Sequence, residues 1–94
     1  MARIAKMVFT EPGDIERLEG LVAELPTFAR VRITQTNGDV VAGVVVERPA
    51  IQVFEDDACE EGINAEVRID DGSGQPVYLW LGDIEKVESI DTAT

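Results

Sequence analysis

The chain has 94 residues, of which 45% are hydrophobic and 29% charged, proportions typical of one folded domain rather than of a disordered segment. Its 19 acidic and 8 basic residues give a formal net charge of −11. This charge repels phosphate backbones at long range, which argues against duplex DNA as a partner. The single cysteine excludes an intramolecular disulfide, and no apolar run approaches the ~20 residues that span a bilayer. We therefore expect a cytoplasmic protein that does not interact with membranes.

A helix is predicted over about residues 14–25. Its apolar side chains recur at intervals of three and four residues, which places them on one face: Ile15, Leu18, Val22 and Leu25. Asp14 is suited to cap the N-terminus and Pro26 to end the helix. Because most amphipathic helices dock in this way, we expect the apolar face to pack on a sheet.

Alternating side chains then predict a first strand near residue 30. Two apolar residues point to one side and three polar residues to the other: Val31 and Ile33 against Arg30, Arg32 and Thr34. The pair Asn37-Gly38 predicts a hairpin turn after it. In the second strand, Gly43 indicates a sharp bend or a close approach between backbones, as at the corner of a barrel.

The rest of the chain predicts further short strands. Pro49 ends the second strand, and a third strand begins near Ile51. Residues 56–75 form a long acidic segment, in which 67–69 indicate one extended stretch, and the last two strands are Val77–Leu81 and Glu85–Ile90. A parallel α/β sheet needs a helix between strands, so it is excluded. We therefore predict a single, mainly β domain over residues 1–94, in which the helix precedes a closed, strongly bent, five-stranded antiparallel barrel over about residues 28–90.

No catalytic arrangement is visible in the sequence. The chain has no histidine, the commonest general base, and Cys59 lies among acidic residues that disfavour its thiolate. Residues 56–61 and 70–71 offer oxygen ligands for calcium or magnesium, but neither stretch has the EF-hand spacing, and solvated loops explain both. We therefore expect no enzymatic activity, no bound metal and no cofactor.

Three motifs resemble the Sm/LSm superfamily, which includes the bacterial RNA chaperone Hfq. Four residues match the spacing of its first motif: Gly38, Val41, Gly43 and Val45. The run 51–58 is similar to its Met-Asn-apolar-apolar run before an acidic loop, and Leu81–Ile84 is similar to its Arg-Gly-Asp motif before the last strand. The resemblance covers about residues 28–90 and implies an SH3-like Sm barrel preceded by a helix. The chain also resembles small bacterial Sm-like proteins described as a domain of unknown function.

The resemblance implies a ligand site at the loop that follows the second strand, with altered residues. The family's aspartate position falls on Arg48 or Pro49, and its asparagine position falls on Gln52. Its arginine position falls on Leu81, which supplies none of the forked donors of a guanidinium. The residues that we predict to contact RNA or another anionic ligand are Arg30, Arg32, Arg48, Gln52 and Gly82.

The resemblance also implies self-association into a homo-oligomer. Sm barrels assemble by pairing the fourth strand of one subunit with the fifth strand of the next, which removes two exposed sheet edges. The residues that we predict at this interface are Val77, Tyr78, Leu79, Trp80, Val87 and Ile90. The acidic segment at 56–75 would crowd one rim of a ring, so the number of subunits stays open.

Two functions remain open from the sequence. The first is a non-enzymatic Sm-like binding module that binds single-stranded RNA or a nucleotide at a degenerate site. The alternative is an acidic interaction and regulatory module that binds a basic partner protein. Small acidic Sm-like proteins include a regulator that binds the transcription terminator Rho, and residues 80–85 are similar to it.

Overall fold

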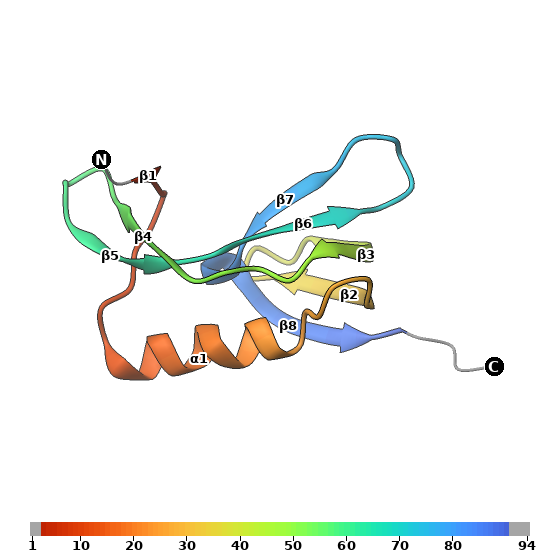
Figure 1. The fold of residues 1–94 in the computed structure, drawn as a ribbon, viewed down its shortest axis with the longest axis horizontal. Helices are drawn as coiled ribbons and strands as arrows, with labels where there is room; N and C mark the ends of the chain where they lie inside the picture. Colours follow the sequence, from red (N-terminus) through yellow and green to blue (C-terminus); the bar gives the residue numbers. More distant parts are fainter. Residues whose placement is uncertain (1–2, 91–94) are drawn as a thin grey trace.

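The computed structural model describes residues 3–90, so residues 1–2 and 91–94 of the predicted domain lie outside it. Figure 1 shows its elements, which are in chain order β1 (Arg3–Ile4), α1 (Pro12–Ala23), β2 (Arg30–Gln35), β3 (Val40–Glu47), β4 (Gln52–Glu55), β5 (Glu61–Asn64), β6 (Glu66–Asp70), β7 (Val77–Trp80), the 3-10 turn η1 (Leu81–Asp83) and β8 (Ile84–Ser89).

Five of the strands form an antiparallel sheet in the order β7-β6-β3-β2-β8. Within the described residues, β7 and β8 are its two edges and do not pair with each other. The five-stranded antiparallel sheet is therefore confirmed, but the predicted closed barrel is wrong. The register shifts between Thr34 and Gln35 in β2, and between Val45 and Glu47 in β3. Such bulges bend and twist the strands, so the sheet curves without closing.

The other three strands form a small second sheet in the order β1-β4-β5. β4 follows β3 after the linker 48–51, and β5 leads into β6 across Ala65. β1 pairs in parallel with β4, where Arg3 is opposite Phe54. Figure 1 shows the β4–β5 hairpin at the opposite end of the molecule from the β6–β7 hairpin. Residues 3–90 thus contain eight strands where five were predicted.

The acidic segment at 56–75 contains two strands where one extended stretch was predicted. These are β5 and β6, which leave a turn at 56–60 and a loop at 71–76. In β6, Val67 and Ile69 are buried, whereas Arg68 and Asp70 are exposed. The charged residues of β6 therefore alternate with its buried residues, as the extended stretch at 67–69 predicts.

The helix α1 begins at Pro12, two residues before the predicted start. Glu11 is at the N-cap position, and Pro12 is at the first helical positions, where its fixed φ suits the helix and its missing N–H is not needed. Asp14 therefore lies in the first turn instead of capping it. The helix ends at Ala23, before the predicted residue 25. No helix within residues 3–90 is long and apolar enough to cross a bilayer.

The core lies between α1 and the five-stranded sheet, as predicted for the amphipathic helix. Helix α1 and the segment that follows it contribute four buried side chains to the core: Leu18, Leu21, Val22 and Leu25. The strands contribute a matching inner face of Val31, Ile33, Val45, Val67, Ile69, Leu79 and Ile84. Figure 1 shows α1 running along one side of the sheet. Side chains that alternate with this inner face, such as the exposed Tyr78 of β7, lie on the opposite side of the sheet.

Two glycines have the roles that the sequence predicts. Gly38 has a φ of 93° in the turn between β2 and β3, a conformation that L residues avoid. A Cβ atom at Gly43 would lie 2.4 Å from the backbone oxygen of Asp70. β3 and β6 thus approach too closely at Gly43 for any side chain.

Candidate functional site

A pocket of about 270 Å³ lies beside the linker between β3 and β4. Its lining comes from the end of β3, the linker, β4, β6 and β7: Glu47, Arg48, Pro49, Ala50, Gln52, Phe54, Glu66, Arg68 and Tyr78. Sites for drug-sized ligands usually enclose ~300–1,000 Å³. The pocket is thus of a size for a single ring system.

A row of three side chains crosses the sheet at this pocket. Glu47 on β3 is the register partner of Arg68 on β6, and Arg68 is the partner of Tyr78 on β7. Such partners have Cβ atoms ~4.5–5.5 Å apart on one face of the sheet. The Cζ atom of Arg68 lies 6.0 Å from the centre of the Tyr78 ring, at the limit of a cation–π contact. The row joins an acceptor, a cation and an aromatic ring.

The bulge in β3 determines which side chain faces Arg68. Val45 is paired with Ile69, so regular pairing would place Val46 opposite Arg68. The register shift places Glu47 there instead. An extra residue in one strand re-aims the following side chains, and here it exchanges an apolar neighbour of Arg68 for a carboxylate.

Two carboxylates flank Arg68 without forming an ion pair with it. Glu66 lies two residues earlier on the same face of β6, and Glu47 lies across the strand. None of these three side chains has a hydrogen bond or an ion pair within the described residues. Glu47 and Arg68 are exposed and Glu66 is half-buried, so water satisfies them. Their hydrogen-bonding groups are available to a ligand.

Apolar groups form the base of the pocket. Phe54 is buried, and its ring meets that of Trp80 edge to face, with centroids 5.1 Å apart and planes at 86°. Ring quadrupoles favour this arrangement, which fixes both side chains. The Tyr78 ring, by contrast, is 55% exposed. A flat ligand can therefore cover Tyr78 while the pocket floor stays fixed.

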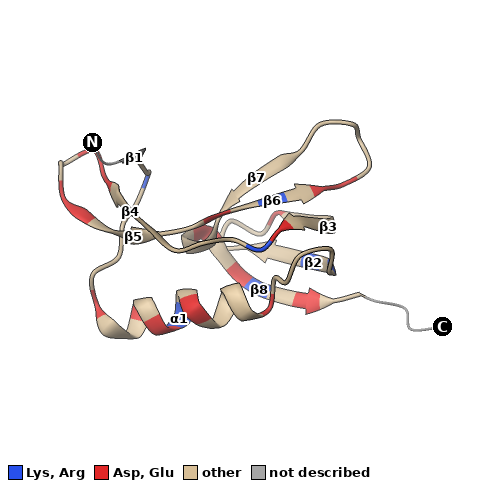
Figure 2. Cartoon of the chain, viewed as in Figure 1, with Lys and Arg blue, Asp and Glu red and all other residues tan. Residues whose placement is uncertain are grey.

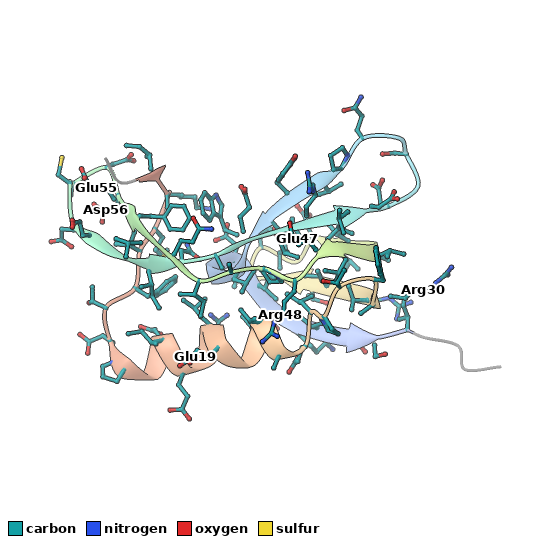
Figure 3. All side chains as sticks on the ribbon, viewed as in Figure 1. Glu19, Arg30, Glu47, Arg48, Glu55 and Asp56 are labelled. Atoms are coloured by element: carbon teal, nitrogen blue, oxygen red, sulfur yellow. The ribbon has the colours of Figure 1, made fainter. Side chains whose placement is uncertain are left out.

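The structure brings together two of the five predicted ligand residues. Arg48 and Gln52 both line the pocket, and Gln52 has an interaction partner. Arg30 and Arg32 lie instead on the exposed side of β2. Figure 3 shows Arg30 at the far end of the sheet from Arg48, pointing away from it. These arginines do not form one patch.

Gly82, the fifth predicted ligand residue, lies in η1 outside the pocket lining. Its N–H donates to Oδ1 of Asn64 at 3.2 Å, and a Cβ atom would lie 2.6 Å from Cε2 of Phe9. Asn64 also donates through Nδ2 to the Met7 carbonyl at 2.8 Å and accepts the Ala65 N–H at 2.8 Å. Gly82 thus allows the N-terminal segment to pack against the sheet.

Arg48 lies between the pocket and a second hollow of about 470 Å³ beside α1. That hollow is lined by Glu19, Val22, Arg48, Pro49, Ala50 and Ile51. Figure 3 shows the Arg48 side chain directed toward the helix. Its backbone N–H donates to Oγ1 of Thr27 at 2.9 Å, which ties the linker to the segment after α1. Arg68 likewise lines a further hollow of about 340 Å³, on the side of the β6–β7 loop, so each arginine of the pocket borders two hollows.

The predicted interface residues are divided between the surface and the core. Tyr78 is exposed on β7, Trp80 is half-buried there, and Ile90 is half-buried beyond β8. The other three contribute to the core or pack against it: Val77, Leu79 and Val87. β7 and β8 are nevertheless the two sheet edges, so each has backbone groups without a strand partner on one side.

Of the charged lining residues, Glu47, Glu66 and Arg68 were not predicted to form a site. The alternation of Arg68 with the apolar residues 67 and 69 indicates that it points outward. No sequence signal indicates that β6 lies between β3 and β7, because that order depends on pairing between distant segments.

The densest acidic stretch lies apart from the pocket, at the β4–β5 turn (Figure 2). Asp56 shapes this turn, because its Oδ1 accepts the N–H groups of Ala58 at 2.9 Å and Glu60 at 3.0 Å. Within residues 3–90, no three aspartate, glutamate or cysteine side chains gather in a way that could hold a metal ion. The turn therefore presents separate, solvated carboxylates.

Comparisons with known proteins agree with this architecture. The model of a protein family described as a domain of unknown function (DUF3247) matches residues 2–90. The crystal structure of XC5848 from Xanthomonas campestris, described as adopting a novel variant of the Sm-like motif, is similar with a TM-score of 0.89. Its sequence is 38% identical, and the match covers 96% of this chain and 99% of that chain. No curated protein matches the sequence. The neighbour supports an Sm-like fold for this chain.

Proposed function

Because the chain belongs to the family described as a domain of unknown function (DUF3247) and has an Sm-like fold, we propose that it is a non-enzymatic binding module that holds a nucleobase in the pocket beside Tyr78. The base belongs to single-stranded RNA or to a free nucleotide. The observation that carries this proposal is the row in which the exposed Tyr78 ring adjoins Arg68, a guanidinium without an ion pair in the described residues.

Stacking is the main source of affinity in this proposal. Every base has a π face, and removal of a stacked aromatic side chain costs ~1–3 kcal/mol per base. The Tyr78 ring is rigidly carried by β7 and open to solvent. Arg68 adds a planar guanidinium, which can stack on a base or donate to its acceptors. The two side chains together favour a flat heteroaromatic ligand.

The charges of the pocket favour a base over a phosphate group. Its lining has two arginines, 48 and 68, and two glutamates, 47 and 66, so its formal charge is zero. Phosphate binding depends on an excess of basic side chains, which neither this pocket nor a chain of net charge −11 provides. An uncharged ring with both donors and acceptors suits such a lining.

The arginine of the Arg-Gly-Asp motif in the Sm/LSm superfamily is not part of the proposal. Leu81 occupies its position in this chain and is fully buried in the core. An arginine there would have to leave the core to meet a ligand. Arg68, which β6 contributes from another direction, is the guanidinium that this chain offers instead.

The substitution Tyr78→Ala tests the proposal. The probes are a labelled single-stranded heptaribonucleotide that contains all four bases, and the four nucleoside monophosphates, which separate RNA from free nucleotide as the source of the base. We expect Tyr78→Ala to raise the Kd of whichever probe binds by about 5- to 150-fold, which corresponds to the loss of one stacked base.

Two further variants control for this effect. Tyr78→Phe keeps the ring and should keep the affinity. Val40→Ala removes another exposed apolar side chain of the sheet, outside the pocket, and should also leave the affinity unchanged. The proposal fails if wild-type protein binds none of the probes, or if Tyr78→Ala binds as tightly as wild type.

We also propose self-association through the edges of the five-stranded sheet. Within residues 3–90, β7 and β8 each have one side without a strand partner, and pairing β7 of one copy with β8 of another would satisfy both. Such pairing would place Tyr78 near a subunit boundary, since it lies on the edge strand β7.

A second candidate function is an acidic module that binds a basic protein. It is favoured by the carboxylates of the β4–β5 turn, which have no ion pair within residues 3–90: Glu55, Asp56, Asp57, Glu60 and Glu61. The salt dependence of binding distinguishes the two candidate functions. Binding of an oligolysine peptide would weaken steeply as salt screens the charges and would not change in Tyr78→Ala. Base binding in a neutral pocket should not weaken with salt, because salt also screens the repulsion between an RNA probe and a chain of net charge −11.

A further inference from the structure

The pocket presents two kinds of hydrogen-bonding partner to a planar ligand. Arg68 can only donate, and the carboxylates of Glu47 and Glu66 can only accept. Glu66 and Arg68 project from the same face of β6, two residues or ~6.8 Å apart along the strand. Glu47 projects from β3 directly opposite Arg68. A base that uses all three groups needs acceptors on one edge and N–H donors on another.

Guanine meets this requirement better than the other bases. Its O6 and N7 atoms are acceptors for an arginine, which is the commonest specific contact to this base. Its N1–H and N2–H groups are adjacent donors, and they match the two oxygens of a carboxylate. Uracil has one N–H donor, and adenine and cytosine each have one amino group on their pairing edges.

Resting on the proposed function, we infer that the pocket selects guanine over uracil and that Glu47 and Glu66 determine this specificity. The base lies on Tyr78, Arg68 donates to its O6 and N7 edge, and the carboxylates accept from N1–H and N2–H. Other ligand classes fit less well. A simple cation or an inorganic phosphate needs an excess of the opposite charge, and this lining has a formal charge of zero.

Three heptaribonucleotides test the inference with the full chain. One is heptauridylate, and the others carry a single central guanosine or inosine. Inosine keeps N1–H, O6 and N7 but lacks the N2 amino group. We expect the guanosine heptamer to bind about 5- to 150-fold more tightly than heptauridylate, with inosine between them. This comparison needs no variant protein.

Two variants then test the residues. Glu47→Gln and Glu66→Gln replace a carboxylate by an amide of the same shape, and circular dichroism shows whether each is folded. We expect the guanosine preference to fall to about 2-fold or less in at least one of them, with heptauridylate affinity unchanged. Glu85→Gln makes the same charge change on β8, outside the pocket lining, and should keep the preference.

The outcomes separate this inference from the proposed function. If the guanosine and uridine heptamers bind equally and Tyr78→Ala weakens both, base binding stands and guanine selection is overturned. If neither heptamer binds and none of the four nucleoside monophosphates binds, both are overturned. If a monophosphate alone binds, base binding stands, and guanine selection is overturned unless guanosine monophosphate binds more tightly than uridine monophosphate. If guanosine is preferred but the preference survives in both glutamine variants, the assignment to Glu47 and Glu66 is overturned.

Discussion

Asn64 shows how one buried amide organises the region next to the pocket. Its side chain is 1% exposed, and both of its polar atoms have partners. Nδ2 donates to the Met7 carbonyl, and Oδ1 accepts from the N–H groups of Ala65 and Gly82. A satisfied buried amide carries little desolvation penalty. These bonds join the N-terminal segment, β5 and η1 in one contact.

The substitution Asn64→Ala should lower the free energy of unfolding by about 2–4 kcal/mol. It leaves the buried Ala65 N–H and the part-buried Met7 carbonyl and Gly82 N–H without their partner, and an orphaned buried group costs ~1–3 kcal/mol. Urea unfolding followed by Trp80 fluorescence measures the change. Gln75→Ala, in the exposed β6–β7 loop, should change stability by less than ~0.5 kcal/mol. A loss below ~1 kcal/mol for Asn64→Ala would mean that these bonds do not hold the region together.

At the scale of elements, two glycines should respond oppositely to the same substitution. Gly43→Ala places a Cβ atom 2.4 Å from a backbone oxygen of β6, so the two strands must separate, at a cost of ~1–3 kcal/mol. Gly20 lies in α1 with no atom within 4 Å of an added Cβ, so Gly20→Ala should stabilise the protein by ~1 kcal/mol. Thermal unfolding midpoints should therefore move in opposite directions. Equal shifts would contradict the close contact between β3 and β6.

The elements that could be predicted are those that depend on nearby residues. The apolar stripe of α1, the turn at Gly38 and the close approach at Gly43 each follow from local spacing or from one residue type. The helix begins two residues before its predicted start because Pro12, a residue type that is favoured at the first helical position, lies there. β1 could not be predicted, because its pairing with residues 54–55 is a contact between distant parts of the chain.

The candidate site could be predicted only in part for the same reason. Arg48 and Gln52 were found through their places in a motif. Glu66 and Arg68 join them only because β6 lies beside β3, and Glu47 faces Arg68 only because β3 contains a bulge. Neither strand order nor a one-residue register shift is visible in local alternation.

At the scale of the whole molecule, the open sheet has a consequence for assembly. Local strand patterns predict curvature but do not specify whether the two ends of a sheet meet, and here β7 and β8 remain apart. An unpaired edge is a template for another strand. The net charge of −11 opposes the approach of a second copy, and salt screens that repulsion.

We therefore expect self-association that strengthens with salt. Sedimentation velocity over a range of micromolar concentrations, at low and at physiological salt, measures the mass of the species present. Growth of a dimer or larger species as salt rises would support pairing through the edges. A monomer at every concentration and both salt levels would contradict it.

Base binding in the pocket is tested most directly by an amide NMR titration of the full chain with the guanosine-containing heptamer. The shift changes should centre on the segments that line the pocket, residues 47–54 and 66–68 and Tyr78. Arg30, Arg32 and the acidic turn at 56–60 should change little. Changes centred on those regions instead, or no changes at all at saturating RNA, would contradict a nucleobase site beside Tyr78.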